Sequence, residues 1–305
     1  MKVVALAGGV GGAKLAHGLA MRLAPEDLTV VVNTGDDFEH LGLSISPDLD
    51  TVMYTLAGVA NAETGWGLAG ESWNFLDALG RLGGETWFRL GDRDLATHVE
   101  RTRRLRAGET LTAVTGALCD ALKVGPRILP MTDDRLRTWV ESEEGRLEFQ
   151  EYFVHRQCRP RVTGFVFEGS ALPTAQVMEA LERAELIVIC PSNPFVSIGP
   201  ILALPGVRER LRGRTVVAVT PIVGGQAIKG PAGKMLAELK LEVSPVAVAR
   251  YYEGVLNGFV LDVVDEGMAN EIASAGLKVA VTDTIMRSDA DRARLAQSVL
   301  DMAGT

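Results

Sequence analysis

Two segments near the start of the chain carry residue types that could act together on a phosphorylated ligand. Residues 3–12 read VVALAGGVGG, an apolar run that breaks into glycines before a helix-like stretch begins at Ala13. Backbone N–H groups at such a turn, together with the dipole of the helix that follows, bind anions. After the next apolar run comes NTGDDFEHLGLSISPDLDTVMY, which contains Asp36, Asp37, Asp48 and Asp50. Carboxylates bind hard cations, so the two segments predict metal-assisted chemistry on a phosphorylated ligand.

The glycine loop Gly8–Lys14 matches neither of the common nucleotide-binding motifs. A Walker A loop would have glycine at Ala13 and Ser or Thr at Leu15, and a dinucleotide fingerprint would have glycine at Lys14. We nevertheless expect phosphate or nucleotide binding here, because the loop follows a strand and opens a helix. Plain packing of a tight turn is the alternative interpretation. The candidate nucleotide-binding residues of this loop are Gly8, Gly9, Gly11 and Gly12.

Asp36 and Asp50 are the carboxylates that we expect to converge on one Mg²⁺. Residues 33–37 follow the second strand, and Asp50 lies in the first turn of a helix that Asp48 would cap. Turn formation alone would also account for Asn, Gly and Asp in such a loop. From spacing, metal binding and ordinary turn chemistry both remain open.

Two later loops follow apolar strands in the same way. The loop PSNPFVSIGPI offers Ser192 and Asn193, and the loop TPIVGGQAIKGPAGK offers Gly224 and Gly225, followed by two lysines. The carboxyl ends of parallel strands lie at one edge of a sheet, where open α/β sheets bind their ligands. We therefore expect both loops to meet the glycine loop at a ligand-binding crevice.

Short β-branched runs alternate with helical stretches over most of the chain. Strands are expected at residues 3–6, 28–32, 186–190, 215–219, 259–263 and 278–281. Helices are expected at 13–23, 174–184, 232–239, 268–275 and 289–302. Near-continuous apolar strands are typical of a parallel sheet buried on both faces. The pattern predicts a doubly wound, mostly parallel, Rossmann-like α/β fold.

Residues 60–160 interrupt this alternation. Helices are expected at 71–82, 92–106 and 109–123, and a β-hairpin at 138–141 and 146–153 around a Glu-Glu-Gly turn. We interpret 60–160 as an insertion, mainly helical with a β-hairpin, within a single α/β domain that spans residues 1–305.

The composition limits the partners. A net charge of −8 disfavours nonspecific nucleic-acid binding, and no apolar run reaches the length of a membrane span. The three cysteines, Cys119, Cys158 and Cys190, lack zinc-binding spacing and are expected to be reduced thiols of a cytoplasmic protein. Small-molecule substrates are therefore the expected partners.

Other polar residues have less distinctive settings. His17, His98 and His155 are expected to be structural or surface residues, whereas His40 lies in the carboxylate segment and could touch a ligand. The basic run 101–106 is expected to form a solvated helix face. Arg89 follows Trp87 and Phe88, a setting that suits either an aromatic ligand pocket or an ordinary surface ion pair. No serine lies in a nucleophile-elbow motif.

Five segments together resemble the 2-phospho-L-lactate transferase family (CofD): LAGGVGGAKLAHGL, VNTGDDFEHLGLSISPDLDTVMYTLAG, WFRLGDRDLATH, ICPSNPFVSIGPIL and VTPIVGGQAIKGPAGKML. The resemblance covers nearly the whole chain. It implies a Mg²⁺-dependent transferase of coenzyme F-420 biosynthesis. Such an enzyme moves a phospholactyl-type group from a guanosine diphosphate-linked donor to the ribityl hydroxyl of a hydroxy-deazariboflavin and releases GMP.

The resemblance also implies roles for individual residues. Asp50 and Arg89 would bind the deazaflavin acceptor, and Asp36 and Asp50 would be the catalytic, metal-linked carboxylates. From loop position we add Gly8–Gly12, Ser192–Asn193 and Gly224–Gly225 as the guanylyl-donor site. The family suggests a homodimer.

Two other functions are compatible with this fold. One is a non-catalytic, nucleotide-sugar-binding regulator of carbon metabolism, and the other is a nicotinamide oxidoreductase. The acceptor-side segments SPDLDTVMYTL and WFRLGDRD favour the transferase, and the broken GxGxxG motif disfavours the oxidoreductase. The sequence leaves open whether the donor carries phospholactate, phosphoenolpyruvate or phosphoglycerate.

Overall fold

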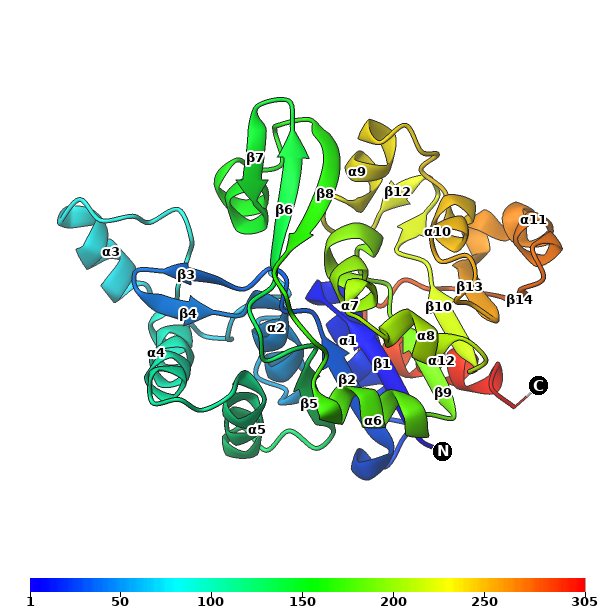
Figure 1. Ribbon diagram of the computed structural model, residues 1–305, viewed down its shortest axis with the longest axis horizontal. Coiled ribbons are helices and arrows are strands. Elements are labelled where there is room, and N and C mark those ends of the chain that lie inside the picture. The colour runs from blue at the N-terminus through cyan, green and yellow to red at the C-terminus, as the bar shows by residue number, and fades with distance from the viewer. Residues whose placement is uncertain (305) are drawn as a thin grey trace.

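A seven-stranded parallel sheet forms the centre of the computed structural model, which describes residues 1–304 (Figure 1). In spatial order its strands are β14 (Lys278–Thr282), β13 (Gly258–Asp262), β10 (Val216–Val219), β9 (Leu186–Ile189), β1 (Val3–Ala7), β2 (Leu28–Val32) and β5 (Arg127–Pro130). Every neighbouring pair is parallel. The predicted Rossmann-like fold is confirmed, with β5 as the strand that the sequence patterns miss.

Helices cover both faces of this sheet. In β1, Val3, Ala5 and Ala7 pack in one hydrophobic cluster with α1 (Gly9–Ala20), α2 (Pro47–Leu56) and α12 (Asp289–Asp301). Val4 and Leu6 point to the opposite cluster, because successive side chains of a strand alternate between faces. The helices of that second layer are α6 (Ala175–Arg183), α7 (Gly199–Ala203), α8 (Val207–Leu211), α9 (Ala232–Glu238), α10 (Pro245–Tyr251) and α11 (Ala269–Ser274).

The strand order reverses between β1 and β9. From β1 the chain proceeds outward to β2 and β5, and after β9 it proceeds in the opposite direction to β10, β13 and β14. Although β1 and β9 are far apart in sequence, Leu6 is in register with Ile189. Loops diverge at such a point and leave a crevice beyond the carboxyl ends of the strands.

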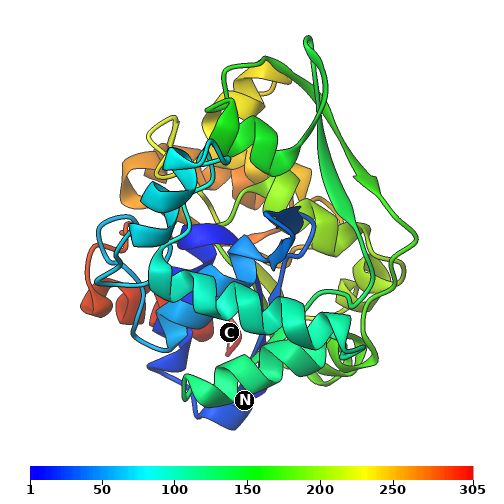
Figure 2. The ribbon, with the colours of Figure 1, turned by 90° about the vertical axis from the view of Figure 1, so that its left-hand side faces the viewer.

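Smaller elements surround this crevice on one side. They are β3 (Phe38–His40), β4 (Leu43–Ile45), α3 (Asn74–Arg81), α4 (Asp92–Arg106), α5 (Leu111–Ala121), β6 (Arg137–Ser142), β7 (Gly145–Glu148), a π-helical turn (Glu151–His155) and β8 (Val162–Glu168). Figure 1 shows α3 projecting from the body and the β6–β8 sheet standing beside the central one, and Figure 2 shows α4 and α5 side by side.

The predicted hairpin is confirmed in the antiparallel pair β6–β7. Its second strand ends at Glu148, because the chain turns into the π-helical segment that begins at Glu151. The extent of the insertion stays a prediction. Within the range 60–160, β5 belongs to the central sheet, and beyond it β8 completes the small sheet.

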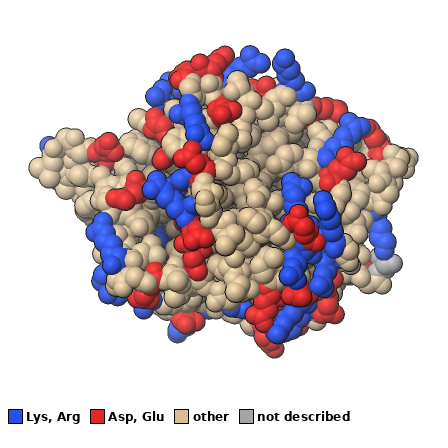
Figure 3. Space-filling model, viewed as in Figure 1, with Lys and Arg blue, Asp and Glu red and all other residues tan. Residues whose placement is uncertain are grey.

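The remaining elements are short. They are the 3-10 turns Pro25–Asp27 and Val263–Met268, the π-helical turn Pro194–Ile198, and the two-residue strands β11 (Ile222–Val223) and β12 (Gln226–Ala227). No helix within residues 1–304 is long and apolar enough to cross a membrane. The three cysteines are free thiols, and basic and acidic side chains are interspersed on the face seen in Figure 3.

Candidate active site

A cavity of about 690 Å³ lies at the carboxyl edge of the sheet. The loops after β1, β2, β9 and β10 all contribute to its wall, as the sequence predicts. The predicted site residues that line it are Gly8, Gly9, Gly11, Asp36, Asp50, Arg89, Ser192 and Asn193. Within residues 1–304 its lining includes neither Gly12 nor Gly224 nor Gly225.

The glycine loop is the first turn of α1 rather than a loop before it. The helix begins at Gly9, not at Ala13, and Gly8 is its N-cap. The N–H of Gly8 donates to Ser192 Oγ (3.1 Å), and the N–H of Gly9 donates to Asp48 Oδ1 (2.7 Å). The next two N–H groups, of Val10 and Gly11, have no acceptor within a helix that starts here, and both residues line the cavity. This turn can bind an anion.

Close packing accounts for two of the glycines. A Cβ atom at Gly11 would overlap the carbonyl oxygen of Pro191, and one at Gly12 would lie 2.5 Å from Ser192 Oγ. The absence of a side chain at each position therefore lets α1 approach the loop after β9. Donor binding by Gly12 stays a prediction.

Ser192 and Asn193 use their side chains to shape their own loop. Ser192 Oγ donates to the carbonyl oxygen of Gly8 (2.7 Å), in addition to accepting from its N–H. Asn193 Oδ1 accepts from the N–H groups of Phe195 and Val196 (3.0 and 3.4 Å) and so begins the helical turn that follows. Both residues thereby fix the backbone that faces the cavity.

The loop after β10 contributes Lys229, one of the two lysines noted in the sequence, whereas within residues 1–304 the cavity lining includes neither of the two predicted glycines. Gly224 donates its N–H to the carboxylate of Asp265, and Gly225 borders a smaller hollow of about 280 Å³. Nucleotide binding by Gly224 and Gly225 stays a prediction. Lys229 of the same loop does line the main cavity, and its Nζ donates to the carbonyl oxygen of Thr64.

One group of buried carboxylates consists of Asp36, Asp37 and Asp48, which we call the first acidic cluster. Burial and the nearby charge of Asp48 raise the pKa of Asp36 well above its ordinary value. Burial raises the pKa of Asp37 to about 7 and that of Asp48 to about 6, despite hydrogen bonds that oppose the shift. Among residues 1–304, neither Asp36 Oδ1 nor Asp37 Oδ1 has a hydrogen-bond partner. This cluster has the charge and the unpaired oxygens that a cation would satisfy.

Asp48 joins two helices instead of capping one. The expectation that it caps α2 is wrong, because Pro47 occupies the first helical position and Ser46 is the N-cap. Asp48 Oδ2 accepts from Asn33 Nδ2 (2.9 Å), while its Oδ1 binds the start of α1. Asn33 also donates to the carbonyl oxygen of Val196 (3.2 Å), so it holds the loops after β2 and β9 together beneath the cavity.

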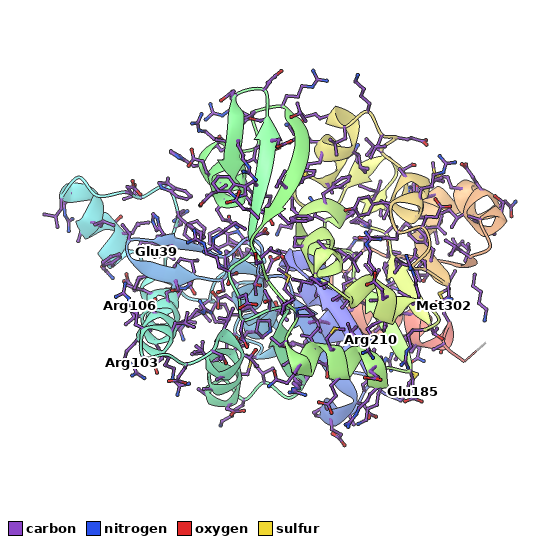
Figure 4. All side chains as sticks on the ribbon, viewed as in Figure 1. Glu39, Arg103, Arg106, Glu185, Arg210 and Met302 are labelled. Atoms are coloured by element: carbon purple, nitrogen blue, oxygen red, sulfur yellow. The ribbon has the colours of Figure 1, made fainter. Side chains whose placement is uncertain are left out.

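Asp50 lies in a second acidic cluster, in which an arginine side chain supplies a positive charge. The Arg101 guanidinium donates from Nη1 to Asp50 Oδ2 (3.0 Å) and from Nη2 to Asp50 Oδ1. Arg101 is only 1% exposed, so the prediction of a solvated basic face is wrong at this position. It holds for Arg103 and Arg106, which are exposed on the outer side of α4 (Figure 4).

His98 and Asp94 complete the second cluster. His98 Nδ1 lies 3.2 Å from Arg101 Nη1, and its Nε2 lies 3.3 Å from Asp94 Oδ2. Asp94 Oδ1 accepts from the Tyr54 hydroxyl (2.6 Å). Burial favours a higher pKa for Asp94, but its close contact with His98 and the hydrogen bond from Tyr54 bring its pKa below the ordinary value. A sequence signal existed, because Asp94, His98 and Arg101 have the i, i+4, i+7 spacing of one helix face.

Aromatic side chains form another wall of the cavity. Trp87 and Phe88 line it, and Trp87 stacks on His155 with ring centroids 5.2 Å apart. Arg89 also lines it, with its guanidinium 4.1 Å from the centroid of the Trp73 ring. Such a wall suits a flat aromatic ligand. His40 packs behind this wall against Phe88 and Trp87. Within residues 1–304 it is not among the residues that line the cavity.

The carboxylates beside the cavity fit Mg²⁺ to different degrees. No group of three or more His, Cys, Asp or Glu side chains suited to a metal occurs in the described part of the chain, residues 1–304. Mg²⁺ commonly keeps waters and takes only one or two carboxylates plus substrate phosphates, so the first acidic cluster fits it. Asp50 fits less well, because Arg101 already engages both its oxygens. Asp36 has an oxygen with no partner among residues 1–304 and lies within reach of the charge of Asp48, whose oxygens accept only from the neutral groups of Gly9 and Asn33. Metal binding by the pair of Asp36 and Asp50 stays a prediction.

Known proteins resemble this chain over nearly its whole length. The sequence model of the family described as 2-phospho-L-lactate transferase CofD matches residues 3–299. A phosphoenolpyruvate transferase of Streptomyces griseus subsp. griseus is 44% identical, with 99% of this chain and 98% of the relative covered. A 2-phospho-L-lactate transferase of Methanosarcina acetivorans is 39% identical, with 99% of each covered.

Solved structures support the fold alone. A upf0052-family protein from Bacillus halodurans superposes with a TM-score of 0.62 at 14% identity, over 98% of both chains. At that identity the likeness is one of architecture, since one fold serves many functions.

Proposed function

The chain belongs to the 2-phospho-L-lactate transferase CofD family, and from this premise we propose the reaction that it catalyses. It transfers a three-carbon phosphoacid group from a guanosine diphosphate-linked donor to the ribityl hydroxyl of 7,8-didemethyl-8-hydroxy-5-deazariboflavin, in coenzyme F-420 biosynthesis. The observation that carries the proposal is the single 690 Å³ cavity, which combines an anion-binding helix start, buried carboxylates and an aromatic wall.

The transfer exchanges one bond to phosphorus for another. The hydroxyl oxygen of the acceptor forms a bond to the phosphorus that carries the three-carbon acid. The bond from that phosphorus to the oxygen of the guanylyl phosphate breaks, which gives a phosphodiester and GMP. The hydroxyl proton leaves with a base or water. In such a transfer the enzyme contributes mainly position and electrostatic stabilisation.

The donor side is assigned to the start of α1. The N–H groups of Val10 and Gly11 offer hydrogen bonds to diphosphate oxygens, and the helix dipole favours negative charge there. Lys229, which lines the cavity, adds a positive charge within reach of the same turn, because a Cβ at Gly65 would contact both Lys229 Nζ and Val10. These groups bind and orient the diphosphate.

A magnesium ion is assigned to the first acidic cluster. Asp36 and Asp48 would hold it, with Asp37 alongside and waters or diphosphate oxygens as the other ligands. When bound, Mg²⁺ neutralises charge on the diphosphate. The carboxylates themselves lose their mutual repulsion when a cation lies between them.

The acceptor side is assigned to Asp50, Arg89 and the aromatic wall. Trp87 and Phe88 provide apolar surface for the deazaflavin ring, and Arg89 provides a cation beside it. Asp50 can accept a hydrogen bond from the ribityl hydroxyl and orient it, or receive its proton. Of the three donors we favour phosphoenolpyruvate, because several relatives with that name, at 41% to 44% identity, are more similar than the 2-phospho-L-lactate transferase of Methanosarcina acetivorans at 39%.

The test is to mix the purified protein with Mg²⁺, the hydroxy-deazariboflavin and each of the three guanylyl donors in turn. Mass spectrometry follows the phosphodiester and GMP. We expect product with the phosphoenolpyruvate-type donor above the other two. A folded protein that binds nucleotide sugars but gives no product with any donor would refute the transferase and favour a regulator.

A further inference from the structure

We propose that Arg101, supported by His98, is a positioning residue that assigns Asp50 to the acceptor hydroxyl and keeps it out of the cation site. The inference rests on the proposed function and adds a residue to its machinery. It starts from Arg101, the largest fully buried side chain of the protein, on a helix whose other arginines are more exposed.

The geometry of the pair fixes the direction of the Asp50 carboxylate. Arg101 donates through two nitrogens to two different oxygens, so the guanidinium plane and the carboxylate plane are locked together. Asp50 lines the cavity, whereas Arg101 is not among the residues within 1–304 that line it. Arg101 therefore occupies the inner side of the carboxylate, and the remaining lone pairs are available on the cavity side.

His98 fixes the guanidinium in turn. An arginine nitrogen can only donate, so His98 Nδ1 is the acceptor at 3.2 Å and the ring hydrogen is on Nε2. That N–H faces Asp94 Oδ2 at 3.3 Å, and Tyr54 donates to the other oxygen of Asp94 at 2.6 Å. Asp94 is thus anchored from α2. Its contact with His98 is electrostatic, since His98 Nε2 has no hydrogen-bond partner among residues 1–304, and the contact at Nδ1 is the one that fixes the guanidinium. The chain of contacts ends at Asp50.

The same contacts separate the two acidic clusters chemically. A carboxylate whose oxygens both accept from a guanidinium is a poor ligand for a hard cation, since it would have to exchange strong hydrogen bonds for metal bonds. Asp36 has an oxygen without any partner among residues 1–304. A divalent cation therefore binds the first cluster, and Asp50 remains for the hydroxyl of the acceptor.

The decisive variant is Arg101→Lys, which keeps the buried charge but cannot form two parallel hydrogen bonds. In the transfer assay we expect KM for the deazaflavin to rise at least about tenfold and kcat to fall. KM for the guanylyl donor and the Mg²⁺ concentration for half-activation should stay within about twofold. Arg103→Lys, on the exposed face of the same helix, is the matched control and should leave all four quantities unchanged.

A second pair of variants tests the role of His98 separately, in case Arg101→Lys folds poorly. His98→Asn places an acceptor oxygen near Nδ1 and preserves the contact to Arg101, whereas His98→Gln preserves a donor toward Asp94 and loses that acceptor. We expect deazaflavin affinity, measured by calorimetry without donor, to be weakened more by His98→Gln than by His98→Asn. Circular dichroism checks that each variant is folded.

The outcomes distinguish this inference from the proposed function. Wild-type transfer with an unchanged deazaflavin KM in Arg101→Lys overturns the inference alone. So does a variant in which donor KM or Mg²⁺ activation changes as much as deazaflavin KM, because Arg101 would then act through the cation site. The reverse order of the His98 variants also contradicts it. Absence of any transfer or deazaflavin binding by folded wild-type protein overturns both.

Discussion

Two clusters of buried carboxylates border one cavity, and they differ in where their positive charge comes from. The first acidic cluster follows β2 and holds oxygens with no partner among residues 1–304, and the pKa values of its carboxyls are raised. The second cluster, around Asp50 and Asp94, receives Arg101 and His98 from α4. A helix outside the central α/β repeat thus supplies the cation of the second cluster.

This difference indicates which kind of ligand each cluster can bind. In the first cluster burial outweighs the charges of Arg101 and Arg137 that face Asp37, so its carboxylates are held at a cost in folding free energy. Such a cost is typical of sites that bind a ligand. A carboxylate that is already paired gains nothing from another cation. The first cluster is therefore suited to a metal ion, and the second is suited to precise placement of a neutral hydroxyl.

The largest expected effect concerns the free energy of unfolding, which an Asp→Asn substitution should lower in the second cluster and raise in the first. Asp50→Asn removes the partner of a buried guanidinium and should lower the free energy of unfolding by about 3–5 kcal/mol. Asp36→Asn removes a buried, repelled carboxyl and should raise it by about 1 kcal/mol when no metal is present. Urea unfolding in EDTA measures both. If both variants lost a similar amount of unfolding free energy, the carboxylates of the two clusters would not differ in how well nearby cations compensate their charge.

The sequence predicts where the first cluster lies better than it predicts the second. Asp36 follows an apolar strand, and strand ends in a parallel sheet meet at one edge, so the position of the loop follows from local pattern. Asp50 is equally visible, but its partner lies 51 residues away on a helix with several arginines. Composition marks that helix as solvated, and only the i, i+4, i+7 spacing of its polar residues indicates a buried face.

Contacts between distant segments explain the other differences. The pattern misses β5 because its apolar centre is only Ile128 and Leu129, and its pairing with β2 decides its structure. Glycines in the first turn of α1 look like a phosphate loop, but Gly11 and Gly12 are required by Pro191 and Ser192, which follow β9. A single sequence does not reveal such a close approach.

An intermediate effect is expected on catalysis. Asp36→Asn should lower kcat about 10²- to 10³-fold and raise the Mg²⁺ concentration for half-activation, since it removes a charge aimed at the cation. Deazaflavin binding in the absence of donor should be unchanged, because Asp50 and the aromatic wall are intact. Initial rates over a Mg²⁺ series, with calorimetry for the deazaflavin, give both quantities. Weaker deazaflavin binding with normal Mg²⁺ activation would show that the clusters have the opposite roles.

The third expected effect is a dependence of stability on pH, which distinguishes the two clusters without any assay of activity. Asp37 is faced by Ser46, Arg101, Arg137 and Asp50, yet burial outweighs the favourable contacts and raises its pKa from 3.8 to about 7. The folded state therefore binds this proton more tightly than the unfolded state does. Between pH 4 and 7 the free energy of unfolding should fall as pH rises, by up to about 1.4 kcal/mol per pH unit for each such carboxyl.

In the second cluster the pKa of Asp94 is shifted in the opposite direction. Asp94→Asn can therefore serve as a control for Asp37→Asn. The pKa of Asp94 is lowered from 3.8, so its contribution is complete above that value and is lost only as pH falls below it. Urea unfolding of the metal-free protein from pH 4.5 to 8 should show a decline that becomes shallower in Asp37→Asn and is unaltered in slope by Asp94→Asn. A stability that stays level or rises over this range would mean that the first cluster is already neutralised in the absence of metal. In that case the raised pKa values and the unpaired oxygens would not indicate a cation-binding site.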